Sequence, residues 1–589
     1  MPQLSVIIPT YNRREMLRAC LEALCQQTQP TTDFEVIVIV DGSTDGTREL
    51  LANLETPFPL RVDWQKNNGQ AAALNRGVEA AEGRYCLFLD DDITADPELV
   101  AEHLRVQTAH GGIMGLGHLT LKLPGRVDGF IRYFADCWTD HYTRMNQGAA
   151  PLTYRDCYSG NMSVPRLTFL EAGGFAVDLP RSYDIELGYR LGRRGLSIVY
   201  IPKAQGQQLY LKGPREIAVD SENAGVAAVE LFRRHPSMLP SLRLGRFGGA
   251  SLPEMLLRRL LLWIAFPSRP LAMFGRLLGR SPWAHTWYHF LDRYCYWRGV
   301  RRAVPDRDTW RRLSQGPIFL MYHACGKTGE PPSRYIMPAR RFARQMAWLK
   351  WRRYHVLSLD EFLRYKAEYR LPPARSVVIT FDDGYADNRT IAYPILRQHG
   401  FTATIFLVSG AVETFNQWDH DSELVGRPLL SWSDIQEMRH GGIDFGAHTR
   451  THVLLTTLPP SQIQDEIEGS RTDIEQKIGC PISTFAYPYG KYDVSSQDMV
   501  ERTGFLAACS CRSGVNDPDT PQYILRRAEI HGTDALASFV LLLQFGGQHV
   551  RSQIGKRKIL TRAVHRLSAL TRTQERRTAL GEELGKRRS

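Results

Sequence analysis

Two separate series of short apolar strands and intervening helices constrain the fold of this chain. The first series lies within residues 1–240 and the second within 315–548, and in both a β-branched run is followed by a polar turn and a helical stretch. Such alternation favours mainly parallel sheets covered by helices. Because a single hydrophobic core rarely grows beyond about 250–300 residues, a chain of 589 residues needs more than one. The sequence therefore predicts two α/β domains.

The segment between the two series, 241–314, is rich in arginine, leucine and tryptophan. Residues 241–312 hold 14 arginines against 4 acids, and 551–589 hold 12 lysines or arginines against 3 acids. Together these two stretches account for more than the whole net charge of +12. We therefore expect a basic helical connector over 241–314 and a basic C-terminal tail over 549–589.

A basic segment with interleaved apolar residues suits an anionic membrane surface, and the same charge attracts nucleic acid. No nucleic-acid-binding motif accompanies the charge, so we favour the membrane. The most apolar run, 256–266, is broken by Arg258 and Arg259 and is shorter than the roughly 20 residues that span a bilayer. It either lies in the membrane interface or packs on the preceding domain as a linker, and a solvated tail remains an alternative for 549–589.

The compartment is predicted from the N-terminus and the cysteines. Residues 1–8 lack the basic region and cleavage site of a secretory signal and are typical of a first strand. The ten cysteines show no pairing pattern beyond Cys509 and Cys511, for which a redox or metal role is the minor alternative. Scattered cysteines favour a reducing compartment. We expect a cytoplasmic protein that is peripheral to the cytoplasmic face of the inner membrane if its basic segments bind lipid.

Polar and acidic side chains follow three strands of the first series. Pro9 and Thr10 end the first strand, Asp41 ends the second, and Asp90-Asp91-Asp92 follows the strand at 85–89. Because ligands of parallel sheets bind at the carboxyl ends of the strands, these residues should converge. Carboxylate oxygens are hard ligands that suit Mg²⁺ or Mn²⁺. Alone, three consecutive acids are explained equally well by a solvated loop or a helix cap.

The order of these motifs resembles the family 2 inverting glycosyltransferases of the GT-A fold. Further matching segments are Asn67-Asn68-Gly69, Asn75-Arg76-Gly77, Asn161, Gly173-Gly174-Phe175 and the stretch 183–191. The resemblance implies a Rossmann-like domain, a nucleotide-sugar donor, a saccharide or lipid-linked saccharide acceptor, and Mg²⁺ or Mn²⁺ near Asp92. It implies Asp184 as the base that deprotonates the acceptor. The donor-binding residues that it implies are Pro9, Thr10, Asp41, Asn75 and Asp90.

This first segment departs from the family pattern at several positions. Val40 replaces an Asp before Asp41, and Tyr183 replaces the Glu before Asp184. Gln207 and Gln208 stand where many relatives carry a histidine beside the metal. The Gln-x-x-Arg-Trp motif of processive synthases is missing, so we expect single transfers rather than polymerisation.

The second series carries a different set of polar residues. Thr380-Phe381-Asp382-Asp383-Gly384 ends one strand, and His448 and His452 follow the strand at 443–447. On a helix the two histidines would share one face, but the preceding strand favours a loop. An Asp with two His at an open metal site can activate water for amide hydrolysis.

These residues resemble the NodB-type polysaccharide deacetylases, carbohydrate esterase family 4, whose fold is a distorted (β/α) barrel. The resemblance implies Asp382 as the general base and Asp383, His448 and His452 as ligands of Zn²⁺, Co²⁺ or Ni²⁺. It also implies an oxyanion contact from the main-chain N–H of Tyr489, which follows Pro488.

Two roles of the deacetylase family have no residue at the usual place. The arginine that braces the catalytic Asp is replaced by Ala486, and Arg527 or its neighbour Arg526 is our candidate to substitute for it. His531 is the candidate general acid, a structural strand-end role for it is equally open, and His323 is a second candidate. The whole chain therefore predicts a bifunctional enzyme of surface glycan biosynthesis that transfers a sugar and removes an N-acyl group. The alternative is an active transferase fused to an inactive, carbohydrate-binding barrel.

Overall fold

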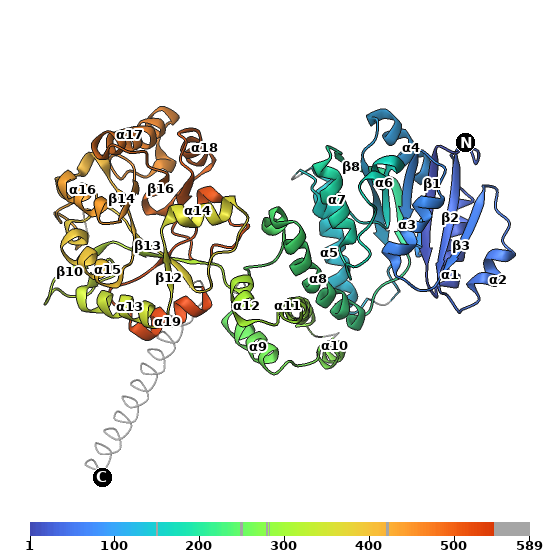
Figure 1. Ribbon diagram of the computed structural model, residues 1–589, viewed down its shortest axis with the longest axis horizontal. Helices are drawn as coiled ribbons and strands as arrows, with labels where there is room; N and C mark the ends of the chain where they lie inside the picture. Colours follow the sequence, from blue (N-terminus) through green and yellow to red (C-terminus); the bar gives the residue numbers. More distant parts are fainter. Residues whose placement is uncertain are drawn as a thin grey trace, which may run out of the picture. The chain divides into compact units, whose positions relative to one another are not determined.

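The computed structural model describes residues 1–125, 127–148, 151–247, 251–278, 281, 283–419 and 423–546. The chain forms two compact units (Figure 1). The first contains Met1–Arg234 and Leu261–Pro305, and the second contains His235–Leu260 and the described chain from Asp306 onward. The chain thus returns once to its first unit. The predicted basic tail lies outside the described residues.

An eight-stranded sheet forms the centre of the first unit, with the order β3-β2-β1-β4-β7-β6-β8-β5. The strands are β1 (Leu4–Thr10), β2 (Phe34–Asp41), β3 (Leu60–Gln65), β4 (Tyr85–Leu89), β5 (Ile93–Ala95), β6 (Met114–Leu121), β7 (Asn161–Pro165) and β8 (Ile198–Gln208). β1 runs parallel to β2 and β4, whereas β7 is antiparallel to β4 and β6. β1 and β2 are buried along their whole length, as expected of strands covered on both faces.

Helices cover both faces of this sheet, because alternate residues of each strand feed two different cores. Ile8 and Val38 pack with α1 (Arg14–Leu24), α4 (Leu99–His110) and α5 (Gly129–Asn146). Ile7 and Ile39 pack with α3 (Gln70–Ala80), α6 (Arg166–Glu171) and α7 (Tyr183–Arg193). The short α2 (Thr47–Ala52) follows β2. The predicted α/β class of this domain is confirmed.

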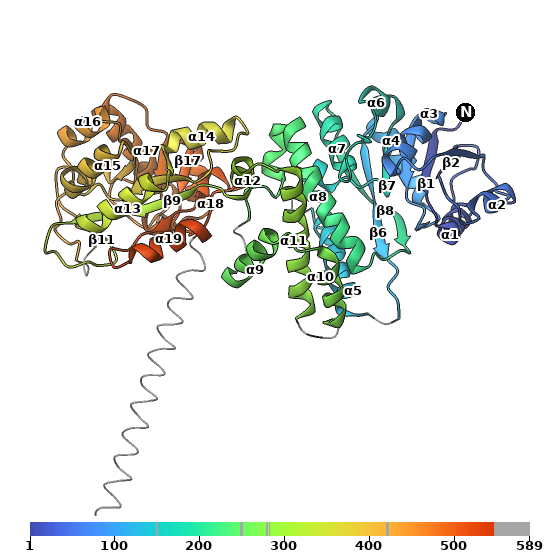
Figure 2. The ribbon, with the colours of Figure 1, turned by 60° about the horizontal axis from the view of Figure 1, so that its bottom comes forward.

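Three further helices, α8 (Pro214–Arg234), α10 (Ser268–Leu277) and α11 (Ala284–Ala303), form an apolar core with α5. α8 and α11 touch through glycines, since a Cβ on Gly299 would lie 1.9 Å from the carbonyl oxygen of Glu222. The elements α5, α8, α10 and α11 can be followed in Figure 2. The helices α10 and α11 of the predicted connector therefore belong to the first unit. α9 (Leu252–Trp263) contains the boundary between the units.

The second unit contains a parallel sheet with the order β17-β16-β15-β14-β13-β9-β18, and β12 also pairs with β13. The strands are β9 (Ile318–Tyr322), β12 (His355–Leu357), β13 (Ser376–Phe381), β14 (Thr404–Leu407), β15 (Asp444–Ala447), β16 (Thr484–Ala486), β17 (Ala507–Cys509) and β18 (Ala528–Glu529). Leu525 pairs with Cys509 on the free side of β17, and Ala528 pairs with Leu320 of β9. The segment around 525–529 therefore borders both ends of the sheet, which gives a distorted barrel.

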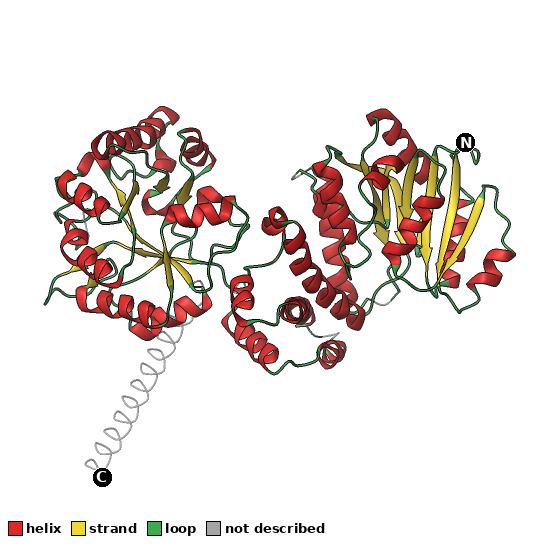
Figure 3. Ribbon diagram, viewed as in Figure 1, coloured by secondary structure: helices red, strands yellow, loops and turns green. Residues whose placement is uncertain are grey.

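Helices surround this sheet, and the strands meet at its centre (Figure 3). They are α13 (Ala339–Trp351), α14 (Leu359–Ala367), α15 (Tyr393–His399), α16 (Trp432–His440), α17 (Pro460–Ile478), α18 (Val494–Arg502) and α19 (Leu536–Phe545). The short α12 (Arg307–Ser314) precedes β9. A two-stranded pair, β10 (Ala324–Gly326) and β11 (Ile336–Pro338), lies outside the main sheet. Among the described helices, none combines the length and the apolar character that a bilayer crossing requires.

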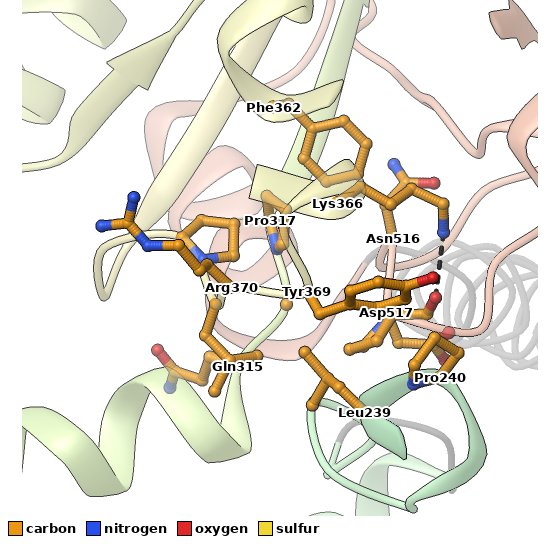
Figure 4. Close-up of a pocket in the computed structure, with 15 residues that line it drawn as sticks. Leu239, Pro240, Gln315, Pro317, Phe362, Lys366, Tyr369, Arg370, Asn516 and Asp517 are labelled. Carbon is orange, nitrogen blue, oxygen red and sulfur yellow. Dashed lines mark hydrogen bonds between the residues drawn. The ribbon is translucent and has the colours of Figure 1, made fainter. Parts of the chain in front are cut away.

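The segment that enters the second unit packs against its loops. Gly245 N donates to the carbonyl oxygen of Leu313 at 2.6 Å, and Arg246 pairs with Asp517 at 3.2 Å. A cavity of about 30 Å³ remains here, and Lys366 beside it donates to the carbonyl oxygen of Pro518 at 2.9 Å (Figure 4). Because this volume has room for only a water or two, we interpret it as a packing gap.

Candidate active sites

A cavity of about 320 Å³ lies at the carboxyl ends of β1, β2 and β4. The predicted residues in its wall are Pro9, Thr10, Asp41, Asp90 and Asp92. They come from three separate sequence segments and meet because β1 pairs in parallel with both neighbouring strands. Asn75 is not among the described lining residues of this cavity.

Asp41 and Asn75 hold the loops around this cavity. Asp41 accepts hydrogen bonds from the main-chain N–H groups of Asn68 and Gly69 at 2.8 and 2.9 Å. Asn75 instead exchanges two hydrogen bonds with the main chain of Phe175, at 2.8 and 2.9 Å. The amide of Asn75 therefore links α3 to the loop before α7 by hydrogen bonds.

Arg13 lies between the carboxylates of the acidic triplet, a contact that sequence reasoning did not identify. Its Nη1 is 3.0 Å from Asp91 Oδ1 and 3.3 Å from Asp92 Oδ2. Its guanidinium also lies 4.6 Å from the ring centroid of Tyr210. Asp90 accepts from the side chain of Gln70 at 2.7 Å. The acidic triplet was a signal for a nearby cationic residue, because three consecutive acids in a buried site require a cation.

The three carboxylates are crowded and mostly shielded from water. Burial raises the pKa of Asp90 to about 7, with Asp92 and Asp91 adding to the effect. Burial also raises the pKa of Asp91 to about 6, although Arg13 opposes it. Oδ1 of Asp92 is buried and has no hydrogen-bond partner within the described chain. This donor set fits a divalent cation, which usually takes one or two carboxylates and completes its shell with substrate phosphates and water.

A second cavity, of about 520 Å³, shares Gln70, Asp90, Gln208 and Lys212 with the first. Asp184 lies in its wall, in the first turn of α7, and accepts from the N–H of Ile185 at 2.9 Å. Burial raises the pKa of Asp184, which favours proton acceptance. Asp184 therefore lines the space that adjoins the first cavity.

In the second unit, Asp383 and two histidines form a compact group. Asp383 follows β13, and His448 and His452 follow β15, two strands further along the same sheet. Oδ1 of Asp383 lies 3.6 Å from Nε2 of His448 and 3.3 Å from Nε2 of His452. One ligand atom from each of the three residues lies within 4.8 Å of the others.

This group has the donor chemistry of a metal site. Oδ1 of Asp383 is buried without a hydrogen-bond partner among the residues that the structure describes. His448 Nδ1 lies 2.7 Å from the carbonyl oxygen of Ala486, which directs Nε2 toward Asp383. Burial lowers the pKa of His448 to about 4, so its imidazole stays neutral, as a metal ligand must. One carboxylate and two imidazoles fit Zn²⁺ or a similar ion with an open position.

Several residues of this site have strained main-chain conformations. Asp383, Thr449, His452 and Tyr489 adopt φ angles of 74°, 66°, 58° and 58°. Residues other than glycine rarely enter this left-handed region, and such residues gather at active sites. The ring of His452 also packs against Tyr489, with centroids 4.7 Å apart. The predicted oxyanion residue therefore lies beside the group of Asp383, His448 and His452.

Arg527 contacts the predicted base directly. Its Nη1 and Nη2 lie 2.5 and 2.8 Å from the two carboxylate oxygens of Asp382, and its side chain is fully buried. Burial alone would raise the pKa of Asp382, but Arg527 lowers it, so the carboxylate stays ionised. Arg526 lies elsewhere, with its main chain bonded to Asn516. Of the two candidates, only Arg527 contacts Asp382.

The two candidate proton donors have different surroundings. His531 Nε2 lies 3.4 Å from Glu529, which also binds Arg334 at 2.9 Å. His323 follows β9, the strand next to β13, and is among the residues that lower the pKa of both Asp382 and Asp383.

Two different protein families match this chain, one within each of its two compact units. Residues 5–163 match the family model for glycosyl transferase family 2, and residues 370–508 match the model for polysaccharide deacetylase. Validoxylamine A glucosyltransferase of Streptomyces hygroscopicus subsp. jinggangensis is 30% identical over 275 residues, 41% of this chain and 63% of that protein. "Putative polysaccharide deacetylase YxkH" of Bacillus subtilis is 28% identical over 234 residues, 39% of this chain and 78% of that protein. The chain thus spans less than two thirds of the first of these two relatives.

Solved structures of a deacetylase and of a glycosyltransferase are also similar to parts of this chain. Streptococcus pyogenes deacetylase PplD in complex with acetate is 23% identical, with a TM-score of 0.35, over 39% of this chain and 98% of that chain. Mannosyltransferase PcManGT from Pyrobaculum calidifontis in complex with GDP-Man and Mn²⁺ is 18% identical, with a TM-score of 0.39, over 52% of this chain and 88% of that chain.

Proposed function

We propose, from the premise that this chain joins a glycosyl transferase family 2 domain to a polysaccharide deacetylase domain, that it builds a surface glycan and trims it. The first unit transfers one sugar from a nucleotide donor to a saccharide or lipid-linked saccharide. The second unit hydrolyses an N-acyl group, most simply N-acetyl, from a sugar. The observation that carries the proposal is the convergence of Asp383, His448 and His452 beside an Asp382 held by Arg527.

In the transferase, the cavity at β1, β2 and β4 is assigned to the donor. Asp41 and the Asn68–Gly69 main chain shape one wall, and the acidic triplet supplies oxygen ligands on another. Mg²⁺ or Mn²⁺ held at Asp91 and Asp92 would neutralise the leaving diphosphate. Arg13 and Lys212 line the same cavity and can contact phosphate oxygens.

The adjoining cavity is assigned to the acceptor. Asp184 accepts the proton of the acceptor hydroxyl while that oxygen attacks the anomeric carbon, and the nucleoside diphosphate leaves from the opposite side. Displacement in a single step inverts the anomeric configuration. The raised pKa of Asp184 supports this role. Single transfer, rather than polymerisation, is supported by the absence of the processive motif in the sequence.

In the deacetylase, Asp383, His448 and His452 would hold Zn²⁺, Co²⁺ or Ni²⁺, which polarises the amide and acidifies water. Asp382 accepts a proton from the attacking water, and Arg527 keeps Asp382 ionised and oriented. The main-chain N–H of Tyr489 faces the developing oxyanion. A proton must then reach the leaving amine, and His531 is the first candidate donor. His323, which follows the strand next to β13, is the second.

A barrel that only binds carbohydrate is the second candidate function, because the usual bracing arginine is replaced by Ala486. The contact between Arg527 and Asp382 favours the active enzyme, since Arg527 supplies the brace from the segment before β18. Metal content separates the two candidates: a stoichiometric metal ion and release of acetate support the enzyme, and a metal-free barrel that binds a saccharide without hydrolysis contradicts it.

The decisive test of the transferase is a screen of nucleotide sugars with the full-length protein and Mn²⁺. Hydrolysis or transfer of one donor, lost in Asp184→Asn, would support the assignment. Turnover of none of the common donors would contradict it. Because nucleotide sugars are cytosolic substrates, we further propose that both reactions occur on the cytoplasmic side.

A further inference from the structure

The acceptor cavity of the first unit has an aromatic wall. The rings that line it are Phe134, Trp138, His141, Tyr142, Tyr158, Tyr183 and Tyr210. Trp138 and Tyr142 come from α5, and Tyr158 precedes β7. The apolar faces of a sugar ring stack on such side chains, while Asp184 lies in the same wall. The cavity therefore suits a saccharide next to the catalytic base.

A third cavity, of about 690 Å³, shares Lys212 with the acceptor cavity. Its cationic residues are Lys122, Lys212 and Arg276, and Asp128 is its only acidic residue among the described lining residues. The carboxylate of Asp128 already caps α5, accepting from the N–H groups of Phe130 and Ile131 at 2.9 Å.

The charges in this third cavity are only partly neutralised. Lys212 pairs with Asp220 at 2.7 Å. Within the described chain, neither Lys122 nor Arg276 forms a salt bridge, so the cavity retains an excess of positive charge. Apolar residues alternate with these cations in the wall, namely Leu123, Phe130, Ile131, Leu209 and Leu211. A phosphate carrying an apolar substituent matches this combination.

Exposed apolar side chains lie on the helix that carries Arg276 and next to that helix in the sequence. Arg276 lies on α10, which is held against α11 so closely that a Cβ on Gly275 would lie 2.9 Å from Tyr288. On α10, Met273 and Leu277 are exposed at 51% and 83%. The tryptophans before α10 and α11, Trp263 and Trp283, are exposed at 83% and 69%. Exposed tryptophans beside an amphipathic helix are typical of the membrane–water interface.

We propose that the glycosyl acceptor is a saccharide joined through phosphate to a membrane lipid. The inference rests on the proposed transferase function. The saccharide occupies the aromatic cavity, the phosphate lies between Lys122, Lys212 and Arg276, and the lipid lies along the exposed side of α10. One cationic side chain, Lys212, borders all three cavities, so the cavities adjoin one another at this residue.

The test measures co-sedimentation of the full-length chain with two kinds of vesicle. One contains phosphatidylcholine alone, and the other also contains a small fraction of a polyprenyl monophosphate. We expect the wild-type protein to bind the second kind more tightly, and Arg276→Gln or Leu277→Glu to weaken that binding about tenfold or more. Matched controls are Arg193→Gln and Leu167→Glu, which change exposed residues on α7 and α6. All variants keep the basic tail, so its contribution cancels.

Several results would overturn the inference. Equal binding of the wild-type protein to both vesicle types would do so, as would equal losses in the control variants. Weakened binding in Arg276→Gln with none in Leu277→Glu would assign the cavity to a soluble phosphate. Binding of a random-sequence RNA with the same dependence on Arg276 would assign it to nucleic acid. If the wild-type protein turns over a nucleotide sugar but does not bind the lipid phosphate, this inference alone is refuted. If it binds the lipid phosphate but turns over no nucleotide sugar, the proposed transferase function is refuted.

Discussion

The guanidinium of Arg527 binds both carboxylate oxygens of Asp382, although the two residues lie 145 positions apart in the chain. Asp382 follows β13, whereas Arg527 precedes β18, and the two strands are separated in the sheet only by β9. A bidentate pair of this kind fixes both the charge and the orientation of the carboxylate. Position 486, on β16, holds an alanine where the family has its bracing arginine. Arg527 provides this contact from the segment before β18, which lies toward the opposite end of the strand order.

Replacing Arg527 should therefore impair the deacetylase even where the new residue keeps the positive charge. We expect Arg527→Lys to lower acetate release about 10- to 100-fold, because a lysine cannot make the bidentate contact. Arg527→Ala should also destabilise the second unit by about 3–5 kcal/mol, since it leaves a buried carboxylate unpaired. Acetate release and thermal unfolding are the measurements. Arg526→Lys is the matched control, and equal effects of both lysine variants would contradict the role of Arg527.

Metal ligand and base should respond differently to substitution. His448→Ala removes one of the three converging donors, so we expect reduced metal content together with loss of acetate release. Asp382→Asn should retain the metal ion and lose turnover, because it removes a proton acceptor. Elemental analysis and an acetate assay on the same preparations test both expectations. Near-normal turnover in Asp382→Asn would refute its assignment as the base.

The two activities should be separable by mutation, since the sites belong to different cores. We expect Asp92→Ala and Asp184→Ala to abolish sugar transfer while acetate release stays within about twofold of the wild-type rate. Donor turnover and acetate release are measured in parallel on folded protein. Loss of both activities in Asp184→Ala would show that the sites are coupled.

The two fold classes could be predicted because each strand carries a strong local signal. The runs Val6–Ile8 and Val36–Val40 are fully buried, and their unbroken apolar character indicates a covered sheet. The acidic and histidine motifs were also predictable, because they directly follow such strands. The local pattern is thus sufficient to place the motif residues at the carboxyl edge of each sheet.

Long-range pairings were harder to predict. The sequence left open whether the run 256–266 packs on the preceding domain, because the return of residues 261–305 to the first unit depends on packing against α5 and α8. The position of Asn75 was also not evident, since its amide bonds to Phe175, 100 residues away. Arg13 was visible in its motif, but its contact with Asp91 depends on how β1 and β4 pair.

Acid should destabilise the first unit through His103. This buried histidine lies between Ser163 Oγ at 2.8 Å and Asn161 Oδ1 at 2.9 Å, and Ser163 also accepts from Gln107. Ser163 can therefore donate to Nδ1 only if the imidazole is neutral, and burial lowers the pKa of His103 from 6.5 to about 4. Because the unfolded chain binds the proton first, stability is complete above pH 6.5 and falls as the pH drops toward about 4.

The expected loss across that interval is about 3 kcal/mol. Urea unfolding of the full-length protein at several pH values measures it, and His103→Gln should flatten the dependence over this range. His110→Gln, at the exposed end of the same helix, is the control. An unchanged slope in His103→Gln would mean that another group is responsible.

The final prediction concerns Arg13, which lies where a cation would contact Asp91 and Asp92. A divalent ion at this site must compete with the guanidinium for the same oxygens. We therefore expect Arg13→Gln to lower the thermal stability of the metal-free protein and to bind Mn²⁺ about tenfold more tightly. Calorimetric titration with Mn²⁺ in a His448→Ala background, which weakens the second site, isolates the effect. Arg18→Gln, on the helix α1 that follows Arg13 and paired with Glu15, is the control. Equal Mn²⁺ affinity in both variants would show that Arg13 does not compete for the metal site.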